Sequence, residues 1–365
     1  MQRILLILSF LLLSFFFAPQ VLAQSDFSEK RFEGTIIAIA ETSRIIEANG
    51  NAHPYQRLKV LGTSGEFKGK TYEVENGSYN QSGVVSYSVG DKVLLSAQKD
   101  VSGRTTIFIN DYVRRGPLYL LAAIFIVLAI VIGGKRGIFS LVGLILTFVL
   151  IFTFVLPAIS SGQNPIVISI IASIVIVPVT FILSHGVNKK TFCAIFSTFI
   201  VLVITAILSQ IFIGATHLSG FSSDEVSFLN TIKKGMVDAK GLLFAGILIA
   251  LLGILDDITI AQSAIVFQLK KANQELGFLE LFKRAMDVGR DHISSMASTL
   301  ILVYAGASLP LLLLFINSPL PYEQVINYEI IAEEIVRTLT ASIGLILAVP
   351  ITTLLTALVA SQRAK

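Results

Sequence analysis

The chain has 365 residues, of which 54% are hydrophobic and 14% are charged, and its mean hydropathy is +0.78. Soluble domains are usually about 45–50% apolar and about 25% charged, so this composition indicates a membrane protein. The net charge of +4 is too small to suggest a nucleic-acid partner. The single cysteine, Cys193, excludes an intrachain disulfide framework and a cysteine-rich metal site.

Residues 1–23 have the pattern of a signal peptide. Arg3 precedes an apolar run that ends at Ala18, and the stretch to Ala23 ends on a small residue. A basic start, an apolar centre and a small-residue exit are typical of secretory signals, so we expect cleavage after Ala23. An uncleaved anchor is the alternative, and both place the next segment outside the cytoplasm.

Residues 24–115 form a distinct polar region in which apolar and polar positions alternate. Five segments have strand character, and turn signals such as Asn49-Gly50 and Asn76-Gly77 separate them. The five segments are 32–39, 56–61, 70–74, 92–96 and 105–109. Short strands at this spacing predict an extracytoplasmic antiparallel sandwich or barrel whose strand order resembles an OB-like barrel. His53 is expected to be a solvated residue in a turn.

Residues 116–365 contain apolar runs that are long enough to cross a bilayer. We predict seven spans, at 118–133, 138–157, 165–184, 192–213, 242–264, 294–316 and 338–360. With the N-terminal domain outside, most Lys and Arg residues of this region fall in cytoplasmic loops, in agreement with the positive-inside rule. The prediction is therefore a seven-helix bundle in a bacterial plasma membrane, with a small outer β domain and a cytoplasmic C-terminus.

The polar segments that flank the last two spans are also predicted to be helical. The inner segment 270–291 is a short basic amphipathic stretch that lies on the membrane surface or serves as an ordinary connector. The outer segment 322–337 is expected to form an amphipathic helix that leads into the last span.

Two adjacent acids, Asp256 and Asp257, interrupt the apolar run 241–271. A carboxylate near the bilayer centre costs roughly 2.5–3.5 kcal/mol, so the pair needs an explanation. Asp257 falls on a stripe of small residues, which predicts that it faces protein or a cavity. That stripe is Gly246, Ala250, Gly253, Ala261 and Ala264. Asp256 lies on a neighbouring polar stripe with Thr259 and Ser263, beside Gln262.

The acids support a functional and a structural interpretation. In the functional one, they form an ion or proton site lined by carboxylates and hydroxyls, because two close carboxylates resist ionising together. In the structural one, they lock helices together or lie at the membrane interface, where a charge is inexpensive.

A second polar segment occurs at the expected cytoplasmic entry of the sixth span. It contains Arg290, Asp291, His292, Ser295 and Thr299. Asp291 is expected to cap the helix start, and the segment is either a proton or anion relay toward the acids or a simple cap with an interfacial histidine. Further along, Tyr304 to Pro310 predicts a broken helix, which transporters use around midplane sites, or a packing kink.

These segments together resemble the YibE/F-like family of bacterial membrane proteins. The resemblance rests on Gly253-Ile254-Leu255-Asp256-Asp257, Gln262-Ser263, Gly289-Arg290-Asp291-His292 and the stretch from Tyr304 to Pro310. It covers residues from about 115 to 360. The family implies a multi-pass membrane protein, often with an outer N-terminal domain, and implies no settled activity, substrate or cofactor.

The leading functional hypothesis is a secondary transporter or ion-coupled permease of unknown substrate. The runner-up is a membrane scaffold or sensor whose outer domain binds a partner, and intramembrane hydrolysis comes third. We expect no enzymatic activity, because the chain has no H-E-x-x-H, G-x-S-x-G or P-loop pattern and its paired acids are on one helix. We expect no cofactor and leave metal binding open. The expected partners are the bilayer and a small ion or solute, and a homo-oligomer is compatible with the sequence.

Overall fold

The computed structural model describes residues 30–46, 52–78, 84–99, 105–233, 237–317 and 319–362. The chain divides into two compact units with a boundary between Val127 and Leu128, and each unit is described by itself. The predicted signal peptide lies outside the described residues.

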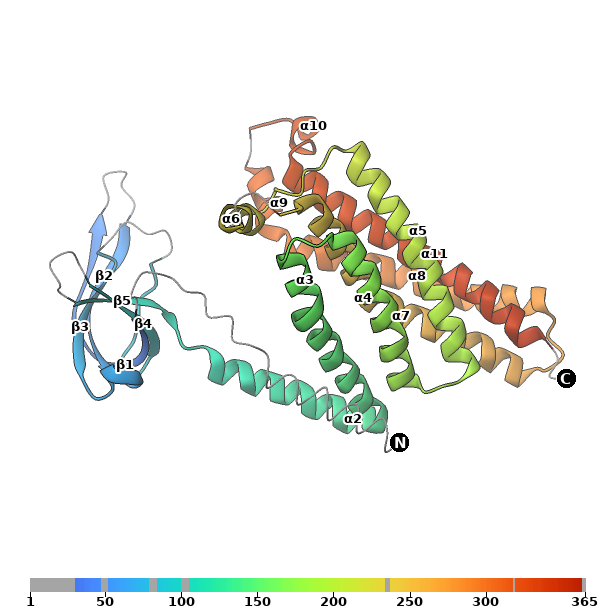
Figure 1. The fold of residues 1–365 in the computed structure, drawn as a ribbon, viewed down its shortest axis with the longest axis horizontal. Helices are drawn as coiled ribbons and strands as arrows, with labels where there is room; N and C mark the ends of the chain where they lie inside the picture. Colours follow the sequence, from blue (N-terminus) through green and yellow to red (C-terminus); the bar gives the residue numbers. More distant parts are fainter. Residues whose placement is uncertain are drawn as a thin grey trace. The chain divides into compact units, whose positions relative to one another are not determined.

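The N-terminal unit is a half-barrel of five antiparallel strands (Figure 1). The strands are β1 (Lys30–Ile46), β2 (Ala52–Gly62), β3 (Thr71–Asn76), β4 (Lys92–Lys99) and β5 (Thr105–Tyr112). Their order in the sheet is β3-β2-β1-β4-β5, so the long β1 pairs with both β2 and β4. The register of β1 against β2 shifts after Ile36 and again after Ile39, and such bulges bend a sheet. All five predicted strands are present, and each is longer than predicted.

The sheet has its own apolar core, which explains the alternation in the sequence. Leu58 and Val60 are fully buried, whereas Lys59 between them is exposed. The buried Gln56 donates from Nε2 to the Tyr87 carbonyl (3.0 Å) and accepts from the Tyr87 amide (2.7 Å), which ties the irregular segment before β4 to the sheet. The prediction for His53 was wrong, because this residue lies in β2 and contacts the Gly77 carbonyl at 3.1 Å.

The C-terminal unit is a bundle of helices. Its principal helices are the part of α2 (Arg115–Leu150) from Leu128 onward, α3 (Leu156–Ser160), α4 (Pro165–His185), α5 (Lys189–Ala215), α7 (Ala239–Ala272), α8 (Phe278–Ala307), α9 (Leu309–Ile316) and α11 (Glu329–Ser361). A π-helical turn, η2 (Ile151–Val155), joins α2 to α3. The shorter α6 (Asp224–Ile232) and α10 (Tyr322–Val325) lie in the connecting segments.

Side-chain caps fix where the apolar helices begin. The first amides of a helix have no partner within it, so an Asn or Asp side chain before the first turn stabilises the start. Asn164 accepts from the Ile166 amide at α4, Asn188 from the Thr191 amide at α5, and Asp238 from the Gly241 amide at α7.

Five of these helical segments are long and apolar enough to cross a membrane, and the bent pair α8–α9 makes a sixth. The first of the five, residues 115–160, is interrupted at Gly134, whose φ of 55° and ψ of −137° lie outside the helical region. A Cβ atom at Gly137 would collide with the Ala129 carbonyl oxygen, so the chain after the interruption passes close to the chain before it. The interruption falls between the first two predicted spans.

The helices α7 and α11 form the centre of the bundle. Both contact α5 and α8 as well as each other, and α7 also contacts α4. Their facing sides bury large apolar residues, among them Leu251 and Leu255 of α7 and Leu345 of α11. At the far ends of α7 and α11, Leu276, Leu281 and Ala285 form a second cluster with Val266 and Ala357. The predicted inner segment 270–291 is therefore mostly helix, continuous with α7 and α8.

The outer segment 322–337 agrees in part with its predicted helix. It begins with the short α10, and the long helix α11 starts at Glu329 after a break. Of the five apolar residues at helical spacing, Val325 and Ile331 are buried, Ile326 is half-buried, and Ile330 and Ile335 are exposed.

We expect the β unit to fold without the helices. A fragment of residues 26–112 should be soluble and β-rich by circular dichroism, because its core is formed by residues of that region alone. Within it, Leu58→Ala should lower the free energy of unfolding by about 2–5 kcal/mol, the usual cost of emptying a packed core site. The exposed Ile46→Ala is the matched control and should change stability little. An unfolded wild-type fragment would show that the sheet depends on the bundle.

Candidate functional site

Asp256 borders a cavity of about 230 Å³ between α2, α4 and α7. Its side chain is half-buried, and its Oδ1 atom has no hydrogen-bond partner among the described residues. Four hydroxyl-bearing residues line the same cavity, namely Ser140, Thr147, Thr180 and Ser184. No Lys or Arg is among its described lining residues, so the carboxylate has no cation beside it in the cavity.

Two of the four hydroxyls in this cavity use their hydrogen within their own helices. Thr147 donates its hydrogen to the Gly143 carbonyl, and Thr180 donates to the Ile176 carbonyl, each at 3.0 Å. A hydroxyl has one hydrogen and two lone pairs, so these two oxygens keep lone pairs but have no further hydrogen to offer. A carboxylate and two such acceptor oxygens are suited to a proton or a cation.

Asp257 lies outside this cavity. Its side chain is exposed, as are Gly246, Ala250 and Gly253 on the same stripe, and nothing lies within 4 Å of a Cβ placed on either glycine. Other members of the stripe border cavities or protein, since Gly253 lines the Asp256 cavity, Gly246 lines the pocket at the start of α11, and Ala261 and Ala264 are half-buried. That Asp257 itself faces protein or a cavity stays a prediction.

Three other predicted site residues of α7 connect helices. Thr259, Gln262 and Ser263 are fully buried. Thr198 Oγ1 lies 3.0 Å from Thr259 Oγ1, and Ser263 Oγ donates to the Lys190 carbonyl at 3.0 Å, which joins α7 to α5. Gln262 Nε2 donates to the Ala285 carbonyl (2.9 Å) and to Thr353 Oγ1 (2.7 Å), which joins α7 to α8 and α11. These hydrogen bonds tie neighbouring helices together, as the structural interpretation of the polar residues of α7 predicts.

The predicted residues of α8 do not line the Asp256 cavity. Arg290 forms an exposed ion pair with Asp287 at 2.6 Å. Asp291 is mid-helix rather than a cap, because α8 begins 13 residues earlier, at Phe278, after Gly277. His292 is half-buried, and its Nδ1 atom has no partner among the described residues.

The remaining residues of α8 lie further along the helix. Ser295 and Thr299 are exposed, and Thr299 donates to the Ser295 carbonyl at 2.9 Å. Tyr304 is half-buried and packs against the core. The predicted helix break is confirmed, since α8 and α9 meet at an angle of 70° beside Ser308. Pro310 lies in the first turn of α9, where a missing amide is tolerated.

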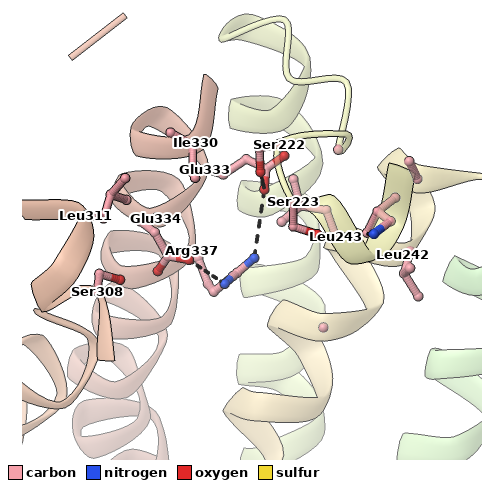
Figure 2. Close-up of a pocket in the computed structure, with 14 residues that line it drawn as sticks. Ser222, Ser223, Leu242, Leu243, Ser308, Leu311, Ile330, Glu333, Glu334 and Arg337 are labelled. Atoms are coloured by element: carbon pink, nitrogen blue, oxygen red, sulfur yellow. Dashed lines mark hydrogen bonds and ion pairs between the residues drawn. The ribbon is translucent and has the colours of Figure 1, made fainter. Parts of the chain in front are cut away.

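A second pocket, of about 280 Å³, lies at the start of α11 and borders the α8–α9 break (Figure 2). Glu333 is 5% exposed, and its Oε2 accepts a hydrogen bond from Ser222 Oγ at 2.6 Å. Arg337 lies 2.6 Å from Glu334 but 4.0 Å from Glu333. The Oε1 atom of Glu333 is buried without a partner among the described residues.

Sequence reasoning missed this pocket because it placed the acids in an outer amphipathic segment. The available signal was their spacing, since Glu329, Glu333 and Arg337 are four residues apart and share one helix face. Glu329 accepts from the amides of Ser219 (2.5 Å) and Gly220 (3.0 Å), so it fixes the loop that carries Ser222. In the described part of the chain, no three His, Cys, Asp or Glu side chains gather as a metal site would require.

Two glycines of α8 give a test of the packing around Gln262. At Gly289 a Cβ would lie 2.5 Å from Val349 Cγ1 and 3.0 Å from Gln262 Nε2, whereas at Gly306 it would meet nothing within 4 Å. Gly289→Ala should destabilise the protein by about 1–3 kcal/mol through overpacking. Gly306→Ala should be neutral or stabilising by up to about 1 kcal/mol, because alanine favours a helix. Thermal unfolding in detergent measures both, and equal midpoints for the two variants would contradict this account.

Comparison with known proteins adds one match. The family model described as YibE/F-like protein matches residues 121–362, which is most of the helical bundle. No curated protein and no solved structure matches the chain. The matched region contains α7, α8 and α11 with both acids and the helix break. Because the match covers well over half of the sequence, the chain belongs to the YibE/F-like family.

Proposed function

We propose that this protein is a secondary transporter or ion-coupled permease, and that Asp256 is its coupling carboxylate. The observation that supports the proposal is that Asp256 lines a cavity with four hydroxyl-bearing residues, while its buried Oδ1 atom has no partner among the described residues. A carboxylate inside a spanning helix is costly unless it pairs with something, and transported protons or cations are natural partners. Binding and release of such a cation changes the charge of the cavity, which is what coupling requires.

The neighbouring acid adds to this role. Asp257 follows Asp256 in the chain but projects from the exposed face of α7. Two adjacent carboxylates resist being ionised together, so the charge of Asp257 favours cation or proton uptake by Asp256. Thr259, Gln262 and Ser263 hold α7 to its neighbours one to two turns away, and so they support the position of the acids.

We further infer that the chain crosses the membrane seven times. This count takes the two parts of α2 on either side of Gly134 as separate spans and the α8–α9 pair as one span. The interruption at Gly134 and the basic pair Lys135 and Arg136 beside it support a cytoplasmic turn there. This arrangement has the N-terminal β unit outside the cell and the C-terminus inside. The strand order of the β unit supports an OB-like barrel.

Substitution of the two acids tests the coupling role. Asp256→Asn should preserve expression and thermal stability, because the amide is similar in size and cheaper to bury, but should reduce ion flux at least tenfold. Asp224→Asn, an exposed acid of α6, removes the same charge as the matched control and should retain wild-type flux, whereas Asp257→Asn should weaken cation uptake less than Asp256→Asn does. Flux is measured in proteoliposomes with an ion that the wild-type protein moves, chosen from a panel of protons, alkali cations and divalent cations. A wild-type protein that moves none of them, or a double Asn variant with wild-type flux, would favour the scaffold.

Cysteine labelling from outside intact cells tests the topology. After replacement of Cys193, a cysteine at Ser78 or Ser223 should react with an impermeant maleimide, because both lie in predicted outer segments. Cysteines at Asn188 and Asn273 should react only after the cells are permeabilised. External labelling at Asn273 would exclude the seven-span arrangement.

A further inference from the structure

We propose that the pocket at the start of α11 binds a small organic cation through a protonated amine held by Glu333. This pocket is separate from the Asp256 cavity, since the two share no lining residue. The inference concerns binding alone and does not depend on the proposed transport.

The carboxylate of Glu333 has no closely paired positive charge in the pocket. Glu333, Glu334 and Arg337 together carry one negative charge when ionised, and Arg337 pairs closely with Glu334 rather than with Glu333. Ser222 donates to one oxygen of Glu333, and the other oxygen is buried without a partner among the described residues. A buried carboxylate in this state is costly unless a donor or cation reaches it, and an ammonium group supplies both.

The shape of the pocket favours an organic cation over a metal ion. Apolar side chains form much of its wall, namely Val226, Leu242, Leu243, Leu311 and Ile330. An alkali ion makes no favourable contact with these apolar side chains, whereas the carbons of an organic cation can cover them. Ligand pockets usually measure about 300–1,000 Å³, so the volume fits an amine with only a few carbons. Its N–H groups would meet Glu333 while its carbons pack against the apolar side.

Several contacts define the wall of the pocket on the α6 side. Gly220 has a φ of 81°, and a Cβ there would lie 2.8 Å from the Lys240 amide nitrogen, so this turn requires glycine. Glu329 accepts hydrogen bonds from the amides of Ser219 and Gly220 in the same turn. The turn leads directly to Ser222, whose hydroxyl lies beside Glu333 (Figure 2).

The proposal is tested by measuring the binding of small probes to the purified full-length protein in detergent. Thermal shift and titration calorimetry measure this binding. The probes are n-butylammonium chloride and two controls. Sodium chloride supplies a cation that has no carbon chain, and butanol supplies the same carbon chain without a positive charge. We expect saturable binding and stabilisation with butylammonium, and no saturable response to the other two at equal concentrations. An equal response to sodium would overturn the organic-cation assignment, and no binding of butylammonium would show that the pocket is not an amine site.

Variants assign the binding to this pocket. Glu333→Gln should weaken butylammonium binding at least tenfold. Glu323 is an exposed acid in α10, so Glu323→Gln removes the same charge and should leave butylammonium binding unchanged.

Gly246→Leu gives an independent variant if Glu333→Gln fails to fold. Gly246 lines the pocket and has open space around it, so leucine should fill the pocket and weaken binding without disturbing the packing. Unchanged affinity in Glu333→Gln, or in Gly246→Leu, would overturn the proposal. No readout here involves ion flux, so failure would leave the Asp256 proposal standing.

Discussion

Every polar group of a membrane-spanning helix must find a partner inside the protein, because lipid offers none. The helix α7 meets this constraint with most of its polar side chains. Thr259, Gln262 and Ser263 reach α5, α8 and α11, and α7 lies between these helices. The hydrogen bonds of these side chains therefore hold the bundle together, and they also give the polar groups of α7 their partners.

Two carboxylates of the bundle are exceptions to this rule. Asp256 and Glu333 each have one oxygen without a partner among the described residues, and each borders a cavity. Both cavities have apolar walls, and they differ in their charged groups, since Asp256 is the only charged residue among the described lining of its cavity, whereas Glu334 and Arg337 line the pocket of Glu333. Other buried polar atoms, such as Gln262 Oε1 and Thr205 Oγ1, also have no partner among the described residues but line neither cavity, so it is the combination of an unpartnered carboxylate and a cavity that marks the two candidate sites.

The sequence predicted the elements better than it predicted which side chains face each other. Alternation and apolar length identified all five strands and the apolar helices, because those patterns report burial directly. The stripe of small residues did not predict which of the two acids lines the cavity between α2, α4 and α7, since such a stripe fits close packing and an open face equally well. The start of α8 was missed because Gly277 supplies no side-chain cap. Glu333 was missed because its partner Ser222 is 111 residues away in the chain.

The close contact between Gly289 and Gln262 has a mechanical consequence. Beyond Gly289, Leu300 is the one buried residue of α8 in the described chain, and Ile293, Met296 and Tyr304 pack against the core in a partly buried state. Ser308 lies about 28 Å further along at ~1.5 Å per residue, where it borders the Glu333 pocket. A rotation of a rigid α8 by about ten degrees at Gly289 would displace Ser308 by about 5 Å, so the angle of α8 at this contact is coupled to the width of the pocket.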